Sequence, residues 1–249
     1  MKQIKWWLLA VLLVVGLTGC GSQTTKKQAT QQAASTKKIS PYVNQQTPTF
    51  YVHGFQGSAK STNTLIAHAE KTAHAHKVLV ATVSTSGQVT LTGKWRGRVR
   101  NPIIQVVFKN NLAQYDQQSA WLAKVITTVQ QQHAFKHYSI VGEDDVANQN
   151  SFLTSGQPKY LHAAYELLAA KRNNFPKNVQ LLNIVGTLND GSHSDSLVTN
   201  VSARSIKYLL RGRDVDYTEK DFYGAHAQHS QVHENAKVAL AVDRFLWHR

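Results

Sequence analysis

From residue 47 to residue 249 the chain alternates short runs of β-branched residues with longer segments whose apolar residues recur at helical spacing. NPIIQVVFKNN and NVQLLNIVG are typical of strands, whereas Leu112–Phe135 and ENAKVALAVDRFLW are typical of helices. Strands that alternate with helices are joined by crossover connections, which produce a mainly parallel sheet with helices on both faces. The sequence therefore predicts an α/β fold.

Capping residues and prolines predict where several helices begin and end. STNTLIAHAEKTAHAH is expected to be a helix capped by Ser61 or Thr62. A second helix is expected to start near Pro158 and to stop before Pro176. NVSARSIKYLLRGR is expected to be a helix capped by Asn200.

The N-terminus has the pattern of an export signal. Lys2 and Lys5 precede the apolar run Trp6–Val15, which is too short for a comfortable membrane span but right for a signal-peptide core. The run ends in LTGC, which resembles the lipobox of bacterial lipoproteins, in which the cysteine becomes the lipidated N-terminus. We expect a signal peptide at 1–19 and lipidation at Cys20; the alternative is an ordinary secretory signal.

Residues 20–46 are rich in Gln, Thr and Ser and nearly free of large apolar residues, which predicts a disordered tether between membrane and domain. Residues 47–249 remain for a single domain. Cys20 is the only cysteine, so an intramolecular disulfide is excluded and the domain must fold on its core alone.

The formal net charge of +14 favours attraction to an anionic surface, either lipid headgroups or acidic wall polymers. Nucleic acid is not expected as a partner, because the basic residues are dispersed and no nucleic-acid-binding motif is present. The densest basic stretch is KWRGRVR, Lys94–Arg100. We interpret it as a solvated hairpin in preference to a binding patch.

Polar residues follow four of the predicted strands, at the ends where open α/β sheets place their sites. These segments are HGFQG (53–57), GEDDV (142–146), GTLNDGSHSDS (186–196) and GAHAQHSQVHEN (224–235). Their order resembles that of the α/β hydrolases, in which an oxyanion-hole loop, a nucleophile, an acid and a histidine follow one another. YVHGFQG, NPIIQVVFKNN, SARSIKYLL and HSQVHENAKVALAVDRFLW together resemble a family of Gram-positive cell-surface hydrolases of unknown substrate.

The resemblance implies a role for particular residues. Phe55 would offer its backbone N–H to an oxyanion, Asp195 would be the acid that orients the histidine, and His229 would be the general base. His233 competes with His229 for this last role, although we interpret it as a helix-surface residue. His53 is expected to be structural and to bond the loop backbone.

The sequence departs from the family pattern at the nucleophile. The family pattern is a G-H-S-M-G type sequence, whereas Glu143, Asp144 and Asp145 follow the strand here, with Val146 crowding a turn that favours small residues. Asp144 is itself a nucleophile, or turnover has been lost, or a nearby serine such as Ser151 has taken over. The carboxylates, with Asp195, are also candidates for holding a hard cation such as calcium.

We interpret the chain as a lipid-anchored, extracytoplasmic α/β hydrolase that acts on an ester or lipid, with Asp144, Asp195 and His229 as catalytic residues. Phe55 and Asp145 would supply the oxyanion N–H groups, and no cofactor or metal is expected. The alternative is a non-catalytic surface-binding module that uses the inherited pocket or the basic face. Asp144 is the feature that distinguishes the hydrolase from the binding module, because a working serine hydrolase would not have an aspartate at this position, whereas a binding module would tolerate it.

Overall fold

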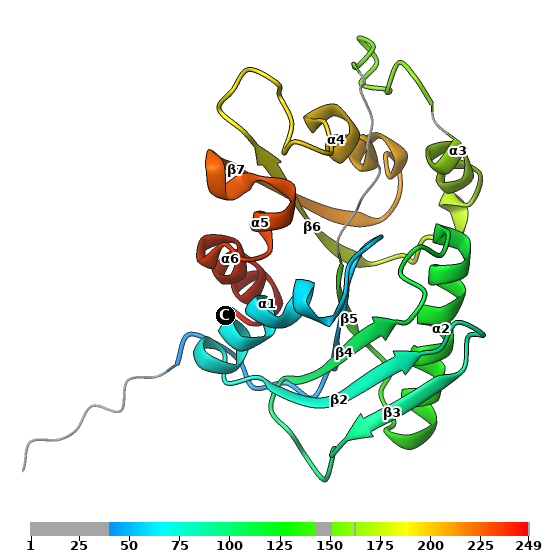
Figure 1. Ribbon diagram of the computed structural model, residues 1–249, viewed down its shortest axis with the longest axis vertical. Helices are drawn as coiled ribbons and strands as arrows, with labels where there is room; N and C mark the ends of the chain where they lie inside the picture. Colours follow the sequence, from blue (N-terminus) through cyan, green and yellow to red (C-terminus); the bar gives the residue numbers. More distant parts are fainter. Residues whose placement is uncertain (1–39, 143–150, 162, 249) are drawn as a thin grey trace, which may run out of the picture. The chain divides into compact units, whose positions relative to one another are not determined.

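The computed structural model describes residues 40–142, 151–161 and 163–248, and the residues from Ser40 onward form one compact unit. The strands and helices follow in the order β1 Thr49–Val52, α1 Ala59–Thr72, β2 His76–Val83, β3 Val89–Gly93, β4 Pro102–Phe108, α2 Tyr115–Gln132, β5 Ser139–Gly142, α3 Ala163–Ala170, η1 Arg172–Asn174, β6 Val179–Thr187, α4 Asn200–Leu209, β7 Val215–Tyr223, η2 Ala225–Ala227, α5 His229–Val232 and α6 Ala236–Trp247. Figure 1 shows how these elements are arranged.

Five strands form a sheet in the order β3-β2-β4-β1-β5, in which every pair is parallel except the β2–β3 hairpin. A second sheet consists of β6 and β7, which are parallel over nine residue pairs. The α/β fold with a mainly parallel sheet is therefore confirmed. Among the described residues, however, β6 pairs only with β7 and β5 only with β1, so the strands are divided between two sheets.

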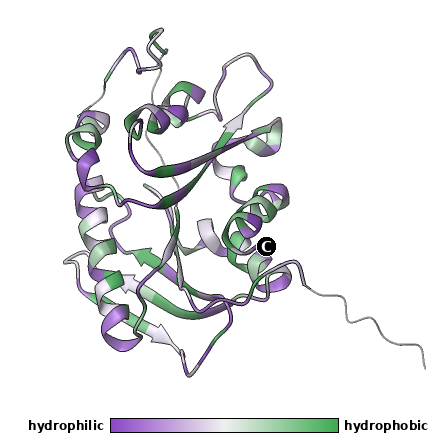
Figure 2. Cartoon of the chain, turned by 180° about the vertical axis from the view of Figure 1, so that it is seen from behind, coloured by the Kyte–Doolittle hydropathy of each residue, from purple (hydrophilic) through white to green (hydrophobic). Residues whose placement is uncertain are grey.

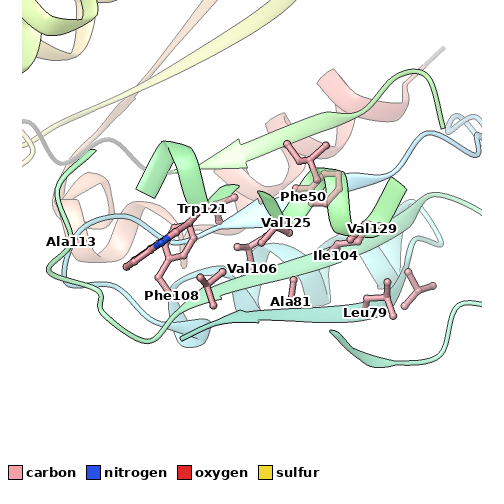
Figure 3. Close-up of a cluster of buried hydrophobic side chains, with 14 residues drawn as sticks. Phe50, Leu79, Ala81, Ile104, Val106, Phe108, Ala113, Trp121, Val125 and Val129 are labelled. Carbon is pink, nitrogen blue, oxygen red and sulfur yellow. The ribbon is translucent and has the colours of Figure 1, made fainter. Parts of the chain in front are cut away.

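Helices cover both faces of the five-stranded sheet because successive strand residues point to opposite sides. Phe50 of β1 packs with residues of β2, β4 and α2 (Figure 3). Val52 belongs to the same cluster, whereas Tyr51 packs with α1 and α6. The α2 cluster includes Ile104, Val106, Trp121, Val125 and Val129, and the other includes Leu65, Ile66, Ala69, Ile103 and Trp247. With two hydrophobic clusters of its own, the unit meets the usual criterion for a domain that folds independently.

The compact unit begins before residue 47. Tyr42 is 8% exposed and forms a β-bridge with His248. The Asn101 N–H donates to the Gln45 carbonyl at 2.8 Å, and the Gln45 N–H donates to Asn101 Oδ1 at 2.9 Å. The sequence predicts that residues 42–45 belong to the polar tether. In the structure they are held against the domain by the buried Tyr42 ring and by the hydrogen bonds between Gln45 and Asn101.

Three helix starts differ from those predicted. Helix α4 begins at Asn200 itself, and its cap is Thr199, whose hydroxyl accepts a hydrogen bond from the Ser202 N–H at 3.3 Å. Helix α1 begins at Ala59, and its cap is Ser58, which forms a capping box with Ser61. Thr62, the other predicted cap, is buried inside the helix. Helix α3 covers only Ala163–Ala170, because the preceding residues form a loop closed by a bridge between Phe152 and Pro158.

Helices α1 and α6 are joined by a buried carboxylate. Asp243 of α6 is fully buried; its Oδ2 lies 2.8 Å from His68 Nδ1 and accepts a hydrogen bond from the Thr72 hydroxyl, both of α1. Asp243 Oδ1 and the Tyr51 hydroxyl are buried without a partner among the described residues. Burial raises the pKa of Asp243, an effect that the bonds from Thr72 and His68 only partly oppose.

Replacing Asp243 by alanine is expected to lower the free energy of unfolding by about 2–4 kcal/mol, because Thr72 and His68 lose a buried acceptor. Urea unfolding at pH 7 measures this loss. The exposed Asp216→Ala is the control, with an expected change below about 0.5 kcal/mol. Equal effects of the two substitutions would contradict a structural role for Asp243.

Asp243→Asn is expected to be less destabilising at pH 7 than at pH 4. A carboxyl with a raised pKa contributes stability that is present below its unfolded pKa and is lost as the pH rises through its folded pKa. The asparagine has no charge to bury, so it avoids this loss at neutral pH. Urea unfolding of the wild type and Asp243→Asn at pH 4 and pH 7 measures this difference. A larger loss of unfolding free energy at pH 7 than at pH 4 would contradict the raised pKa.

Candidate active site

The loop after β1 is held in one conformation by His53, which is 2% exposed. The Phe108 N–H donates to His53 Nε2 at 3.0 Å, so the ring proton lies on Nδ1 and is donated to the Gly54 carbonyl at 2.9 Å. His53 thus bonds the loop backbone, as expected from its position. Gln56 adopts a positive φ of 61°, and its N–H donates to the Asn111 carbonyl at 2.8 Å.

Phe55 lies at the turn of this fixed loop, with its side chain 37% exposed. None of the hydrogen bonds within the described residues is donated by its backbone N–H. A rigid turn with an available N–H is the geometry that an oxyanion donor requires. The expected role of Phe55 remains a prediction, since the nucleophile segment opposite it in the family pattern lies outside the described residues.

Asp195 follows β6 in a loop that fixes both of its carboxylate oxygens. Its Oδ1 accepts hydrogen bonds from the backbone N–H groups of Leu197 at 2.9 Å and Val198 at 2.7 Å. Its Oδ2 lies 2.9 Å from His229 Nδ1. Burial acts to raise the pKa of Asp195, but the hydrogen bonds from His229, Val198 and Leu197 outweigh it, so the pKa lies below its ordinary value.

His229 is joined to Asp195 twice, although 34 residues separate them in sequence. Besides the side-chain contact, the His229 N–H donates to the Asp195 carbonyl at 2.8 Å. Because an ionised Asp195 carboxylate only accepts, Nδ1 of a neutral His229 must carry the proton, which leaves Nε2 as the basic nitrogen. This is the tautomer that a general base needs.

His233 does not take this place. Its Nε2 lies 3.5 Å from Glu234 Oε1, and Glu234 accepts a hydrogen bond from the Thr64 hydroxyl of α1. Among the described residues it is His229, not His233, that meets Asp195.

Four of the predicted site residues lie outside the described residues: Cys20, Glu143, Asp144 and Asp145. The convergence of Asp144 with Asp195 and His229 therefore stays a prediction, as does the oxyanion role of Asp145. The cation site proposed for these carboxylates stays untested for the same reason. Of its four candidate ligands, only Asp195 is described, and Asp195 directs Oδ2 at His229.

Gly186 of β6 is a site-positioning residue that the sequence reasoning missed. A Cβ added at Gly186 would lie 2.2 Å from the Ala227 carbonyl oxygen and 3.2 Å from Asp195 Cβ. The turn of η2, which leads to His229, therefore packs directly on the strand. A glycine inside a strand pattern indicates such a close approach of another backbone, and this was the signal available in the sequence.

Comparison with known proteins shows the family of the chain. Residues 36–144 and 143–249 match the family described as alpha/beta hydrolase of unknown function (DUF915), and the chain belongs to this family. The two matched segments meet at residues 143–144, directly after β5, where the sequence departs from the hydrolase nucleophile pattern. No curated protein matches the sequence.

Two solved structures share the fold. The lin2722 gene product of Listeria innocua is 20% identical, with a TM-score of 0.71 over 81% of this chain and 94% of that one. A protein from Lactobacillus plantarum, described as "the putative cell surface hydrolase", is 21% identical, with a TM-score of 0.65 over 82% of this chain and 92% of that one.

Gly186→Ala is expected to move the turn that carries His229 and to lower the free energy of unfolding by about 1–3 kcal/mol, because the new methyl group overlaps the Ala227 carbonyl. Thermal or urea unfolding measures this effect. Gly191→Ala, in the loop that follows β6, is the control. Its Cβ meets nothing within 4 Å, so only the strain of its φ of +83° remains, which costs about 1 kcal/mol.

Asp195→Asn is expected to make the free energy of unfolding less dependent on pH in the acid range. A carboxyl whose folded pKa is lowered contributes stability that is present above its unfolded pKa and is lost as the pH falls through its folded pKa. The wild type should therefore lose more stability than Asp195→Asn between pH 6 and pH 3. His229→Ala should remove part of this difference. Identical profiles for all three proteins would contradict the hydrogen bonds assigned to the Asp195 carboxylate.

Proposed function

Because the chain belongs to an α/β-hydrolase family and its Asp195 and His229 side chains meet at 2.9 Å, we propose that it hydrolyses esters, with His229 as the general base. The substrate class is an ester or lipid, in line with the chemistry that the resemblance implies. The contact between Asp195 and His229 carries the proposal, since a carboxylate fixed on a histidine is the arrangement that prepares a base.

In this proposal each site residue has a defined task. Asp195 holds the His229 ring with Nδ1–H directed at its carboxylate and stabilises the imidazolium that forms when Nε2 accepts a proton. The backbone N–H groups of Phe55 and Asp145 would stabilise negative charge that develops on the substrate oxygen.

Asp144 is the proposed nucleophile and would react by a different route from serine. Its carboxylate attacks the alkyl carbon of the ester, the bond from that carbon to the departing carboxylate breaks, and an alkyl ester of Asp144 forms. A water deprotonated by His229 then adds to the carbonyl carbon of that ester. The alcohol leaves with the proton from His229, and the Asp144 carboxyl group then releases its own proton to solvent, which restores the carboxylate. Attack on the acyl carbon would give an anhydride instead.

The proposed location is the outer side of a cell membrane. Residues 1–19 would act as the signal peptide, Cys20 would carry lipid, and the residues that follow would tether the domain. The name of the similar Lactobacillus plantarum protein supports a cell-surface location. Within the described residues, no helix is both long and apolar enough to cross a membrane.

The second candidate function is a surface-binding module that has lost turnover. Two observations favour it: the family match is divided into two segments that overlap at residues 143–144, and three adjacent carboxylates there would oppose a developing oxyanion. Such a module would hold lipid or an anionic wall polymer through the inherited pocket or the basic face. The loop after β3, with exposed Lys94, Arg96 and Arg98, offers the cationic groups for an anionic polymer.

Hydrolysis of short-chain and long-chain esters by wild type, His229→Ala, Asp195→Asn, Asp144→Ala and Asp144→Ser separates the two functions. The hydrolase proposal predicts turnover by the wild type that falls on the order of 10³-fold in His229→Ala and Asp195→Asn. It also predicts that Asp144→Ala is inactive. His226→Ala, in the same loop as His229 but outside the pair, is the matched control and should keep wild-type activity.

An inactive wild type together with an active Asp144→Ser would identify a pocket that lost only its nucleophile and would support the binding module. Wild-type turnover that survives in His229→Ala would overturn the assigned base. Turnover that is lost in His229→Ala but retained in Asp144→Ala would mean that His229 activates water directly and that Asp144 is not the nucleophile.

A further inference from the structure

The segment between β5 and β6 exposes an unusual number of large apolar side chains. Six of them lie within 17 consecutive residues, and each is 40–56% exposed: Phe152, Leu153, Tyr160, Leu161, Leu167 and Leu168. In helix α3 only Tyr165 is buried among the side chains described. Soluble proteins rarely leave apolar residues gathered in this way, and such surfaces mark contact with a partner or a membrane.

Polar contacts hold this segment to the rest of the domain, so its apolar side chains are not needed for that purpose. The Arg211 side chain donates to the Ser155 carbonyl at 3.0 Å, and the Tyr208 hydroxyl donates to Gln157 Oε1 at 3.4 Å. The Tyr165 hydroxyl donates to the Ser205 carbonyl at 3.3 Å. Figure 1 shows the segment and α3 at the edge of the domain, and Figure 2 shows hydrophobic and hydrophilic residues mixed along them.

Basic residues accompany the apolar ones. Lys159 and Lys171 are exposed, and Lys159 lies 5.3 Å from the centre of the Tyr160 ring. Arg172 follows at the end of α3, and Glu166 is the only acidic residue from 151 to 172. An apolar surface with a cationic border is complementary to an anionic lipid interface, in which headgroups attract the lysines and acyl chains receive the apolar groups.

We propose that the exposed apolar side chains of residues 152–161 and 167–168 form a surface that docks on an anionic lipid bilayer. A second copy of the chain fits less well, because a symmetric contact through this surface would bring two sets of basic residues together. Helix α3 is about 12 Å long at 1.5 Å per residue, so it lies in the interface and does not cross a hydrocarbon core of about 30 Å. In the proposed lipoprotein, lipid on Cys20 would hold the domain near a membrane, and this surface would be a second contact with it.

Co-sedimentation with lipid vesicles tests this surface. The protein is the compact unit, residues 40–249, so that the apolar run near the N-terminus does not contribute. The vesicles are phosphatidylcholine alone or with 30% phosphatidylglycerol. The wild type is expected to bind the anionic vesicles, and the triple variant Phe152→Ser/Leu153→Ser/Leu168→Ser is expected to bind about tenfold more weakly or less. Lys159→Gln/Lys171→Gln should lose mainly the preference for phosphatidylglycerol.

The matched control is Leu112→Ser/Tyr223→Ser, which removes apolar side chains that are 57% and 63% exposed elsewhere on the domain. This control should bind as the wild type does. Equal binding by the control and the triple variant would overturn the proposal, as would a wild type that does not bind anionic vesicles. Sedimentation equilibrium without lipid detects a dimer; self-association lost in the triple variant would assign the surface to a second copy and also overturn it.

A probe on the surface provides a second measurement that does not depend on removing side chains. Residues 40–249 contain no cysteine, so Leu168→Cys can be labelled with an environment-sensitive fluorophore at a single site. Its emission should shift to the blue with anionic vesicles, whereas a label at Leu112→Cys should not shift. Equal shifts at both positions would overturn the assignment to residues 152–168. None of these positions belongs to the Asp195–His229 site, so the result is independent of catalysis.

Discussion

The domain depends on an interior strand of only four residues. Strand β1, Thr49–Val52, lies between β4 and β5 and is buried throughout. Its side chains alternate between the cluster against α2 and the cluster against α1 and α6, so the same short segment joins both layers. Its carboxyl end continues into the His53 loop. A change in the register of β1 would reverse its side chains and would also displace that loop.

The layers also align the two loops that carry the candidate site. Helix α1 begins just after the loop of Phe55, and α6 begins just after the segment that bears His229. Asp243 and Glu234 each join α6 and its approach to α1 through hydrogen bonds. The packing of these helices therefore relates the oxyanion loop to the histidine, although neither helix supplies a reacting group.

The sequence predicts the periodic parts of the structure well, because burial dictates them. Alternating strands and helices gave the α/β class, and the ordered polar loops placed Asp195 and His229 in separate segments that the structure brings together. The helix starts that the sequence does not predict are decided by competition between alternative local hydrogen bonds. Ser58 caps α1 ahead of Ser61 because it completes a capping box, and a bridge at Phe152 replaces the start of a longer α3. The division of the strands into two sheets depends on long-range pairing, which no local pattern encodes.

The two parts of the candidate site follow strands of different sheets. The Phe55 loop follows β1 of the five-stranded sheet, whereas Asp195 and His229 follow β6 and β7 of the two-stranded sheet. A molecule that contacts both the Phe55 loop and the Asp195–His229 pair binds only while the two sheets keep their relative positions. By mass action such a ligand raises the stability of the whole domain as its concentration increases. The unfolding temperature is therefore itself a reporter of the unknown substrate, even if the chain that binds it never turns it over.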